Sequence, residues 1–186
     1  MAVFISGTGS NAQRIINRFS GHDQIHVLCL VSTRPNIEIA KTCKELNVNY
    51  IESSFSESEH EGILEQLEQL AIEWVVLAGF LKKIPQAMLK QFPKRIINLH
   101  PSLLPKFGGK GMYGMHVHRA VIEANEKESG ITIHYVNENY DEGKIITQIK
   151  TPVYTSDDAT SLFERIRQLE ADHFPCVVEQ EVIKNG

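Results

Sequence analysis

The chain has 186 residues, of which 42% are hydrophobic and 23% are charged, and its formal net charge is -4. This length and composition are typical of one globular domain with a sizeable core, so we expect residues 1–186 to form a single domain. The negative charge, without a basic run, argues against nucleic acid as a partner, although it leaves room for a local anion pocket.

The sequence contains no signal for a membrane or for secretion. No apolar run approaches the roughly 20 residues that a membrane span needs, and the first residues lack the basic region and cleavage site of a signal peptide. We therefore expect a cytoplasmic protein without a membrane partner. The three cysteines are isolated and odd in number, which predicts reduced side chains that behave as small hydrophobic residues, and no metal site or disulfide.

The first two thirds of the chain alternate short apolar runs with helical patterns, as βαβ units of a parallel sheet do. The predicted strands cover residues 3–6, 25–32, 48–51, 74–78 and 95–99. The predicted helices cover residues 12–19, 37–46, 57–71 and 85–91. This alternation predicts an α/β, Rossmann-like fold with a mostly parallel twisted sheet and helices on both faces.

The last third of the chain has a different pattern. A helix is predicted over residues 116–125, and two strands, over 131–136 and 145–152, are joined by a short polar turn. So short a connection predicts an antiparallel or mixed C-terminal edge of the sheet. Asp157 and Asp158 open a final helix, which we expect Pro175 to kink or interrupt.

The most informative motif is Asn98-Leu99-His100-Pro101-Ser102-Leu103-Leu104-Pro105, directly after a predicted strand. Because residues i and i+2 of a strand face the same way, Asn98 and His100 are expected to leave the strand side by side. An amide and an imidazole in this arrangement suit a reaction in which a carbonyl oxygen becomes an oxyanion. The alternative is an ordinary turn with a surface histidine.

Two further segments are candidate parts of a site. In Ser6-Gly7-Thr8-Gly9-Ser10-Asn11 the glycines allow close backbone approach, and Ser10 or Asn11 could cap the next helix, so the first-turn N–H groups could hold a phosphate. The alternative is a capped helix after a glycine-rich turn.

The second segment is the turn Asp141-Glu142-Gly143. One of its carboxylates could face His100 and raise its pKa, with the glycine bringing the loop close; the alternative is a structural turn. His134 is expected to face the motif, because Ile131 and Ile133 would occupy the opposite, apolar face of the strand.

Together with Leu77-Ala78-Gly79-Phe80-Leu81, these motifs occur in an order that resembles the glycinamide ribonucleotide formyltransferases, a family of the folate-dependent formyltransferase superfamily. The likeness runs from Val3 to about Glu181, and its Asn-His-Pro-Ser motif is highly specific. It implies transfer of a formyl group from 10-formyltetrahydrofolate, a co-substrate, to the amine of glycinamide ribonucleotide in purine biosynthesis. No metal is implied, and the protein is expected to be a monomer or homodimer.

The resemblance also implies individual roles. The family's catalytic trio matches Asn98, His100 and Asp141, with His134 as a supporting residue. The substrate phosphate would bind in the N-terminal half, at Gly9, Ser10 and Asn11, and Glu170 would contact the same substrate. The folate would pack in the C-terminal half, against Leu81, Lys82, Ile84, Asn139 and Tyr140.

The chain departs from the family pattern in three places. It has Asp141-Glu142-Gly143-Lys144 where Asp-x-Gly-Pro is common, Lys82 where Arg is frequent, and a long glycine-rich loop over Gly108-Gly109-Lys110-Gly111-Met112-Tyr113-Gly114. These differences concern the folate loops and leave the expected reaction unchanged.

Other functions stay open on the sequence. A formyltetrahydrofolate deformylase would direct water at the same carbon, but it usually carries an extra N-terminal domain and a second histidine in place of Pro101. A formyltransferase acting on initiator tRNA would need a second, basic domain. A non-catalytic nucleotide-binding module would not need Asn98, His100 and Asp141 together.

Overall fold

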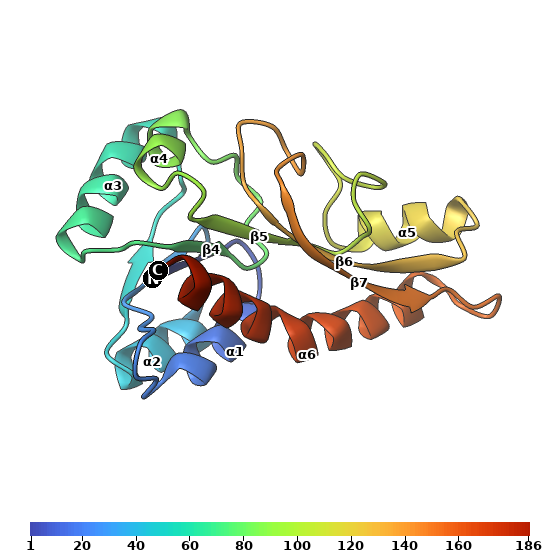
Figure 1. The fold of residues 1–186 in the computed structure, drawn as a ribbon, viewed down its shortest axis with the longest axis horizontal. Coiled ribbons are helices and arrows are strands. Elements are labelled where there is room, and N and C mark those ends of the chain that lie inside the picture. Colours follow the sequence, from blue (N-terminus) through green and yellow to red (C-terminus); the bar gives the residue numbers. More distant parts are fainter.

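The apolar runs pair into one seven-stranded mixed sheet in the computed structural model, which describes all 186 residues (Figure 1). The strand order is β3-β2-β1-β4-β5-β6-β7. The strands are β1 (Ala2–Ile5), β2 (Cys29–Ser32), β3 (Asn49–Glu52), β4 (Val75–Leu77), β5 (Ile96–His100), β6 (Glu128–Tyr135) and β7 (Ile145–Pro152). The first five are parallel, whereas β6 and β7 are antiparallel, which confirms the predicted fold class.

Six α-helices connect and cover the strands. They are α1 (Ser10–Phe19), α2 (Ile37–Glu45), α3 (His60–Gln69), α4 (Gln86–Gln91), α5 (Met115–Glu123) and α6 (Ala159–Asn185). Figure 1 shows α1, α2 and α6 on one side of the sheet and α3 and α4 on the other. Because the central parallel strands β1, β2 and β4 are covered on both faces, they consist entirely of buried residues.

Two hydrophobic clusters fill the layers between the sheet and its helices. The larger joins alternate strand residues such as Val3 and Ile97 to α1, α2, Val121 of α5, and α6. The smaller joins the opposite faces of the same strands, among them Phe4 and Ile96, to α3 and α4. The two-residue alternation of the strands therefore places each neighbouring pair of side chains in different cores.

Several predicted boundaries are wrong, each for a local reason. Strand β2 begins at Cys29 rather than at residue 25, because its register with β1 starts at the pair Ala2 and Cys29. The predicted helix over residues 57–71 is a 3₁₀ turn, Glu57–Glu59, followed by α3. It ends before Ala71, whose φ of 49° is left-handed.

Of the predicted kink or interruption at Pro175, the interruption is wrong. The helix runs from Ala159 to Asn185 with Pro175 inside it, and Figure 1 shows it curving along the sheet. A proline inside a helix costs about 3 kcal/mol. Phe174 and Val178 are fully buried beside it, so their packing against the sheet offsets this local cost.

The strand order reverses direction between β1 and β4. From β1 the chain continues to β2 and β3 on one side, whereas β4 leads to β5 on the other, and ligands of open α/β sheets bind where the order reverses in this way. The loops that follow β1 and β4 are tied together, because the Leu81 N–H donates to Ser6 Oγ at 3.1 Å. The motifs singled out in the sequence lie at or beside the carboxyl ends of these strands.

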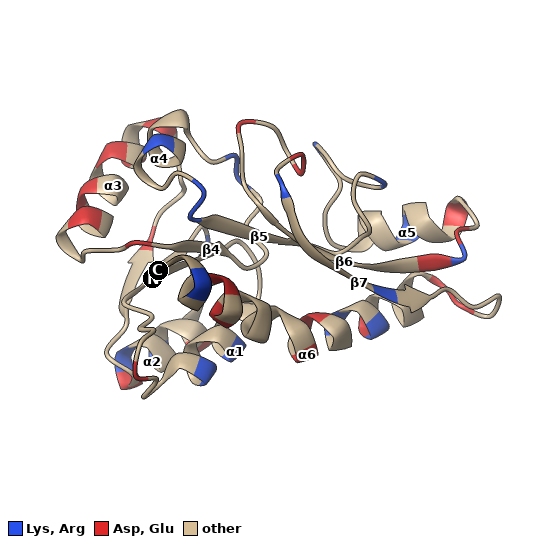
Figure 2. Ribbon diagram, in the orientation of Figure 1, with Lys and Arg blue, Asp and Glu red and all other residues tan.

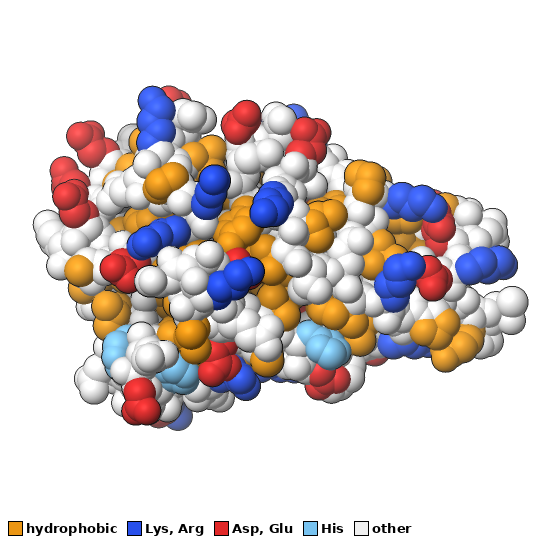
Figure 3. All heavy atoms as spheres, in the orientation of Figure 1, with side chains coloured by type: hydrophobic (Ala, Val, Ile, Leu, Met, Phe, Trp, Pro, Cys, Tyr) orange, Lys and Arg blue, Asp and Glu red, His pale blue; other side chains and the backbone are white.

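Charged residues lie on the helices, the loops and the outer strands (Figure 2). Strands β1, β2, β4 and β5 contain no Lys, Arg, Asp or Glu. On the face seen in Figure 3, lysine and arginine side chains surround an area of hydrophobic side chains. No helix combines the length and the hydropathy that crossing a bilayer requires.

Candidate active site

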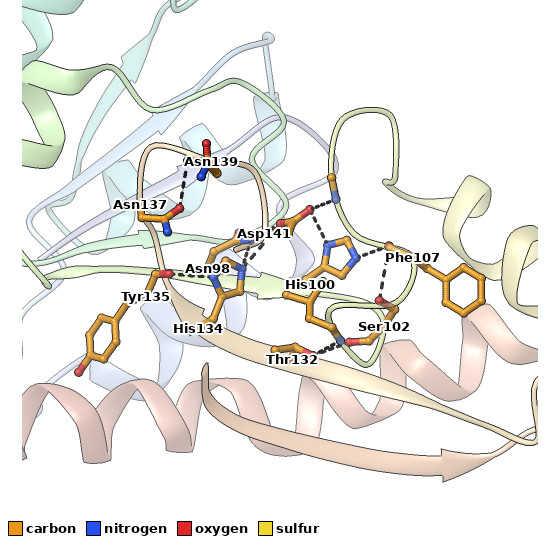
Figure 4. A network of polar contacts seen from close by, with 12 residues as sticks. Asn98, His100, Ser102, Phe107, Thr132, His134, Tyr135, Asn137, Asn139 and Asp141 are labelled. Carbon is orange, nitrogen blue, oxygen red and sulfur yellow. Dashed lines mark hydrogen bonds and ion pairs between the residues drawn. The ribbon is translucent and has the colours of Figure 1, made fainter. Parts of the chain in front are cut away.

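The candidate site begins at the end of β5, where β6 runs back beside it. The register pairs Asn98 with His134 and His100 with Thr132, so all four side chains share one face of the sheet. Figure 4 shows three of them, Asn98, His100 and His134, converging on Asp141, whereas Thr132 lies beside Ser102. The structure therefore bears out that Asn98 and His100 lie side by side and that His134 faces the motif.

Asp141 reaches this face from the loop between β6 and β7. Its Oδ2 lies 3.5 Å from His100 Nδ1, and its Oδ1 lies 3.5 Å from Asn98 Nδ2 and 3.7 Å from His134 Nε2. Asp141 itself has a φ of 58°, in the left-handed region that Asp tolerates. At Gly143 the loop backbone passes so close to β6 that a Cβ there would lie 1.7 Å from the carbonyl oxygen of Tyr135.

His134 fixes the orientation of the Asn98 amide. Its Nδ1 lies 2.8 Å from the carbonyl oxygen of Tyr135, which can only accept, so Nδ1 carries the proton of the neutral ring. Nε2 is then an acceptor, and Asn98 Nδ2 donates to it at 3.0 Å. The second N–H of Asn98 is held only by the long contact with Asp141, which leaves it available to another acceptor.

The same reasoning fixes His100. Its Nε2 lies 2.8 Å from the carbonyl oxygen of Phe107, so Nε2 carries a proton and the lone pair of the neutral ring is on Nδ1, beside Asp141. The loop that supplies this carbonyl is held by Thr132 of β6. Thr132 Oγ1 donates to the Ser102 carbonyl at 2.6 Å and accepts from the Leu104 N–H at 3.0 Å.

Burial and charge act in opposite directions on His100. Burial lowers its pKa below the usual value and outweighs the opposite effects of Asp141 and the Phe107 carbonyl. This corrects the expectation that a neighbouring carboxylate raises the His100 pKa: Asp141 acts in that direction, but burial lowers the pKa overall, which favours the neutral ring. For Asp141, burial raises the pKa, but its polar surroundings, which include the hydrogen bond from the Gly109 N–H, lower it overall, so the carboxylate is ionised.

The glycine-rich loop after Phe107 touches the Asp141 carboxylate. The Gly109 N–H donates to Asp141 Oδ2 at 2.8 Å. A Cβ at Gly108 would lie 3.2 Å from Asp141 Cβ and 2.5 Å from Leu104 Cδ2, so no side chain fits there without displacing a neighbour. Sequence reasoning missed Phe107, Gly108, Gly109 and Thr132 as parts of the site. The glycine run itself was the available signal, because repeated glycines mark close backbone approach.

The second predicted segment lies at the start of α1. Gly9 has a φ of 78°, and a Cβ there would lie 3.2 Å from Ile5 Cδ1, so this backbone conformation favours glycine. Neither Ser10 nor Asn11 caps the helix, contrary to the prediction: Gly9 is the N-cap residue and no side chain bonds the first turn. The first N–H groups of α1 therefore lack partners within the helix, which makes them available to an anion.

Glu170 lies beside this segment although it is distant in the sequence. Asn11 Nδ2 donates to Glu170 Oε2 at 2.8 Å, and Arg14 donates to Asn11 Oδ1 at 3.3 Å. Burial raises the pKa of Glu170, against the opposite effects of Asn11 and Arg14. The predicted substrate-binding residues of the N-terminal half and of α6 are thus brought together.

A small hollow adjoins Asn98 and Asp141, with a volume of about 60 Å³. Its walls include four of the predicted folate residues, Lys82, Ile84, Asn139 and Tyr140. Leu81 does not line it and is 43% exposed. The remaining walls include Phe80, from the motif after β4, and three residues that sequence reasoning did not single out: Lys83, Val136 and Asn137. No group of three or more His, Cys, Asp or Glu side chains is arranged to hold a metal ion.

Comparisons with known proteins agree with this geometry. A family model described as formyl transferase matches residues 1–178. The chain is 39% identical over 186 residues to the chloroplastic phosphoribosylglycinamide formyltransferase of Vigna unguiculata, covering 96% of this chain and 59% of that protein. It therefore spans less than two thirds of that relative's length. With the phosphoribosylglycinamide formyltransferase of Haemophilus influenzae it shares 33% identity, covering 96% of this chain and 85% of the relative.

Solved structures show the same likeness. The crystal structure of phosphoribosylglycinamide formyltransferase from Bacillus halodurans superposes with a TM-score of 0.87 at 30% identity, over 100% of this chain and 96% of that one. The corresponding enzyme from Geobacillus kaustophilus, described as glycinamide ribonucleotide transformylase 1, gives a TM-score of 0.83 at 33% identity, over 95% of each chain.

Proposed function

The chain belongs to the formyl transferase family, and from this premise we propose that it transfers the formyl group of 10-formyltetrahydrofolate to the amine of glycinamide ribonucleotide. One observation carries the proposal. Asn98, His100 and Asp141 meet within 3.5 Å at the end of β5, which is the arrangement that acyl transfer to an amine requires. The relatives named above support the choice of substrates.

Asn98 acts on the formyl oxygen. As the amine attacks the formyl carbon, negative charge develops on that oxygen. One N–H of Asn98 makes only a 3.5 Å contact with Asp141, so it is available to donate to this oxygen. His134 keeps the amide in this orientation, since the other N–H remains bonded to its Nε2. A preorganised donor of this kind is worth about 10²- to 10³-fold in kcat.

His100 and Asp141 move one proton. The attacking nitrogen must lose a proton and the leaving N10 of the folate must gain one, so the reaction needs a relay and no net acid or base. The lone pair on His100 Nδ1 accepts the proton from the amine. The imidazolium then lies beside the Asp141 carboxylate, which stabilises it, and it donates the same proton to N10 as the C–N bond breaks.

The lowered pKa of His100 suits this relay, because a buried neutral ring gains a proton only while the neighbouring oxyanion exists and releases it afterwards. The glycinamide ribonucleotide phosphate would bind to the free N–H groups at the start of α1. Glu170, next to Asn11, would accept a hydrogen bond from the same substrate.

The folate would enter the hollow between Ile84 and the Asn139–Asp141 turn. Its apolar walls, Phe80, Ile84 and Val136, suit a flat ring, and the amides nearby suit its polar edge. The volume of about 60 Å³ is well below the roughly 300 Å³ at which ligand pockets begin. The loop over 137–144 must therefore move outward when the folate binds.

The test is a formyl-transfer assay with both substrates. The protein is mixed with 10-formyltetrahydrofolate, with and without glycinamide ribonucleotide, and the release of tetrahydrofolate is followed by absorbance. We expect folate turnover only when the amine is present, with formylated ribonucleotide identified by mass spectrometry. Equal folate consumption without the amine would instead identify a hydrolase.

A further inference from the structure

A second, larger hollow lies on the other side of the loop that carries Asp141, outside the proposed reaction site. It has a volume of about 630 Å³, within the range of small-molecule sites. It is bordered by the segment that leads into β5, the start of β7 and the last turns of α6. In Figure 3 this face shows hydrophobic side chains ringed by lysine and arginine.

Four positive side chains line this hollow: Lys94, Arg95, Lys144 and Lys184. They come from separate segments, and Figure 2 shows blue ribbon at the start of β5, near the start of β7 and near the end of α6, on one face of the molecule. None of the four forms an ion pair within the chain.

The only carboxylate in the lining, Glu181, already accepts hydrogen bonds from the Tyr135 hydroxyl and from Asn185. Four positive side chains against one negative leave the lining with a charge of +3 in a chain whose net charge is -4. Such a concentration of unpaired charge in a concave surface attracts anions.

The floor of the hollow offers different chemistry. Val136, Ile145 and Ile146 form an apolar area, with the Ile145 side chain 42% exposed. Trp74 also lines the hollow; it is 2% exposed, and its buried Nε1–H has no hydrogen-bond partner. The guanidinium of Arg95 lies 5.8 Å from the centre of this indole ring.

We propose that this hollow binds a nucleotide, with the phosphates on the four cations and the base against the apolar floor. Inorganic phosphate alone would leave the apolar floor unused, and an uncharged aromatic molecule would leave the cations unpaired. A nucleotide has both parts and a size that matches about 630 Å³. The amide of Asn137, whose Nδ2 bonds nothing in the protein, is a donor for a sugar or base oxygen.

Occupancy of this site would act on the reaction site through a shared wall. Val136 and Asn137 line both hollows, and Lys144 ends the loop that carries Asp141. A nucleotide that holds this loop would restrict the movement that folate entry requires. The binding site is an independent proposal, however, and its test needs no folate.

The experiment uses the single tryptophan of the chain, Trp74, as the reporter. AMP, ATP and inorganic triphosphate are titrated into the protein at moderate salt. Emission is excited at the red edge of tryptophan absorption, where the bases absorb little, and calorimetry gives an independent dissociation constant. The test variant is Lys94→Ala/Lys184→Ala. The control is Lys41→Ala/Lys90→Ala, which removes the same charge from exposed lysines outside the lining.

We expect ATP to change the Trp74 emission saturably, and the dissociation constant to rise tenfold or more in the test variant but less than twofold in the control. Lys144→Ala should weaken binding in the same direction, which guards against a misfolded double variant. The proposal is overturned if neither method detects binding at millimolar ATP, if both double variants weaken it equally, or if inorganic triphosphate binds as tightly as ATP. The assay for formyl transfer plays no part, so failure of that function would leave this result interpretable.

Discussion

Gly108 offers the sharpest test of how the glycine-rich loop supports the reaction. The substitution Gly108→Ala adds one methyl group, and the φ of Gly108 is not in the left-handed region, so the backbone accepts alanine. The new Cβ would lie 2.5 Å from Leu104 Cδ2 and 3.2 Å from Asp141 Cβ. Normal carbon contacts are about 3.5 to 4.0 Å, so the leucine methyl must retreat by about 1 Å and Asp141 by a few tenths.

The consequence for activity follows from the position of Asp141. Its carboxylate is held by the Gly109 N–H at 2.8 Å and lies 3.5 Å from His100, so a displacement lengthens one contact or the other. Misplacing a reacting group by about 1 Å costs on the order of 10²-fold. We therefore expect kcat to fall by roughly 10- to 100-fold while the KM of the ribonucleotide changes little.

Steady-state kinetics on the purified variant measure this, with the folded fraction checked by thermal melting because overpacking costs about 1–3 kcal/mol. The matched control is Gly62→Ala in α3, where nothing lies within 4 Å of the added Cβ. It should keep normal kcat and gain stability of about 0.5–1 kcal/mol. Normal turnover in folded Gly108→Ala would refute the view that this loop positions Asp141.

Three further predictions concern other parts of the chain. Gly9→Asp, which adds a carboxylate to the proposed phosphate site, should raise the ribonucleotide KM tenfold or more without changing the KM of the folate. A folded variant whose ribonucleotide KM equals that of the unchanged protein would exclude the site. His100→Ala and Asp141→Ala should each lower kcat by about 10² to 10⁴, and the double variant should be little worse than the worse single one, since both serve one proton; additive losses would contradict the relay. Burial lowers the pKa of His118 to about 4, so the unfolded chain takes up its proton first as the pH falls. From this group alone the free energy of unfolding should drop by about 2 kcal/mol between pH 7 and pH 5, and His118→Leu should remove that share of the pH dependence, as melting curves at both pH values would reveal.

Much of the fold was predictable because it depends on local patterns. Alternating apolar runs and helical stripes identified the five parallel strands, and the short turn before residue 145 identified the antiparallel edge. The wrong predictions concern residues whose secondary structure depends on contacts with residues distant in the sequence. The sequence around Ile25 reads as a strand, but pairing with β1 begins only at Cys29. Pro175 signals a break, but the packing of Phe174 and Val178 overrides it.

The candidate site divides in the same way. Asn98 and His100 were predicted to lie together because the two-residue period of a strand dictates it. The partners of His100 were not predictable, since the Phe107 carbonyl depends on the path of a loop. Nor was its protonation: Asp141 raises the pKa as expected, but how strongly burial lowers it depends on the finished fold. The basic hollow was hidden for a related reason, because Lys94, Lys144 and Lys184 lie in three separate segments.

The antiparallel direction of β6 explains why one loop serves both hollows. If β6 were parallel to β5, it would end beside His100. Because β6 is antiparallel, it ends beside the start of β5 instead, where the Val136 N–H donates to the Ile96 carbonyl at 2.9 Å. The chain must therefore turn back along β5 for Asp141 to reach His100, and the left-handed φ of Asp141 and the close approach at Gly143 make that turn. As a result the loop has the folate hollow on one side and the basic hollow on the other. A ligand that holds Lys144, the last residue of this loop, therefore also restricts the position of Asp141 within the same loop.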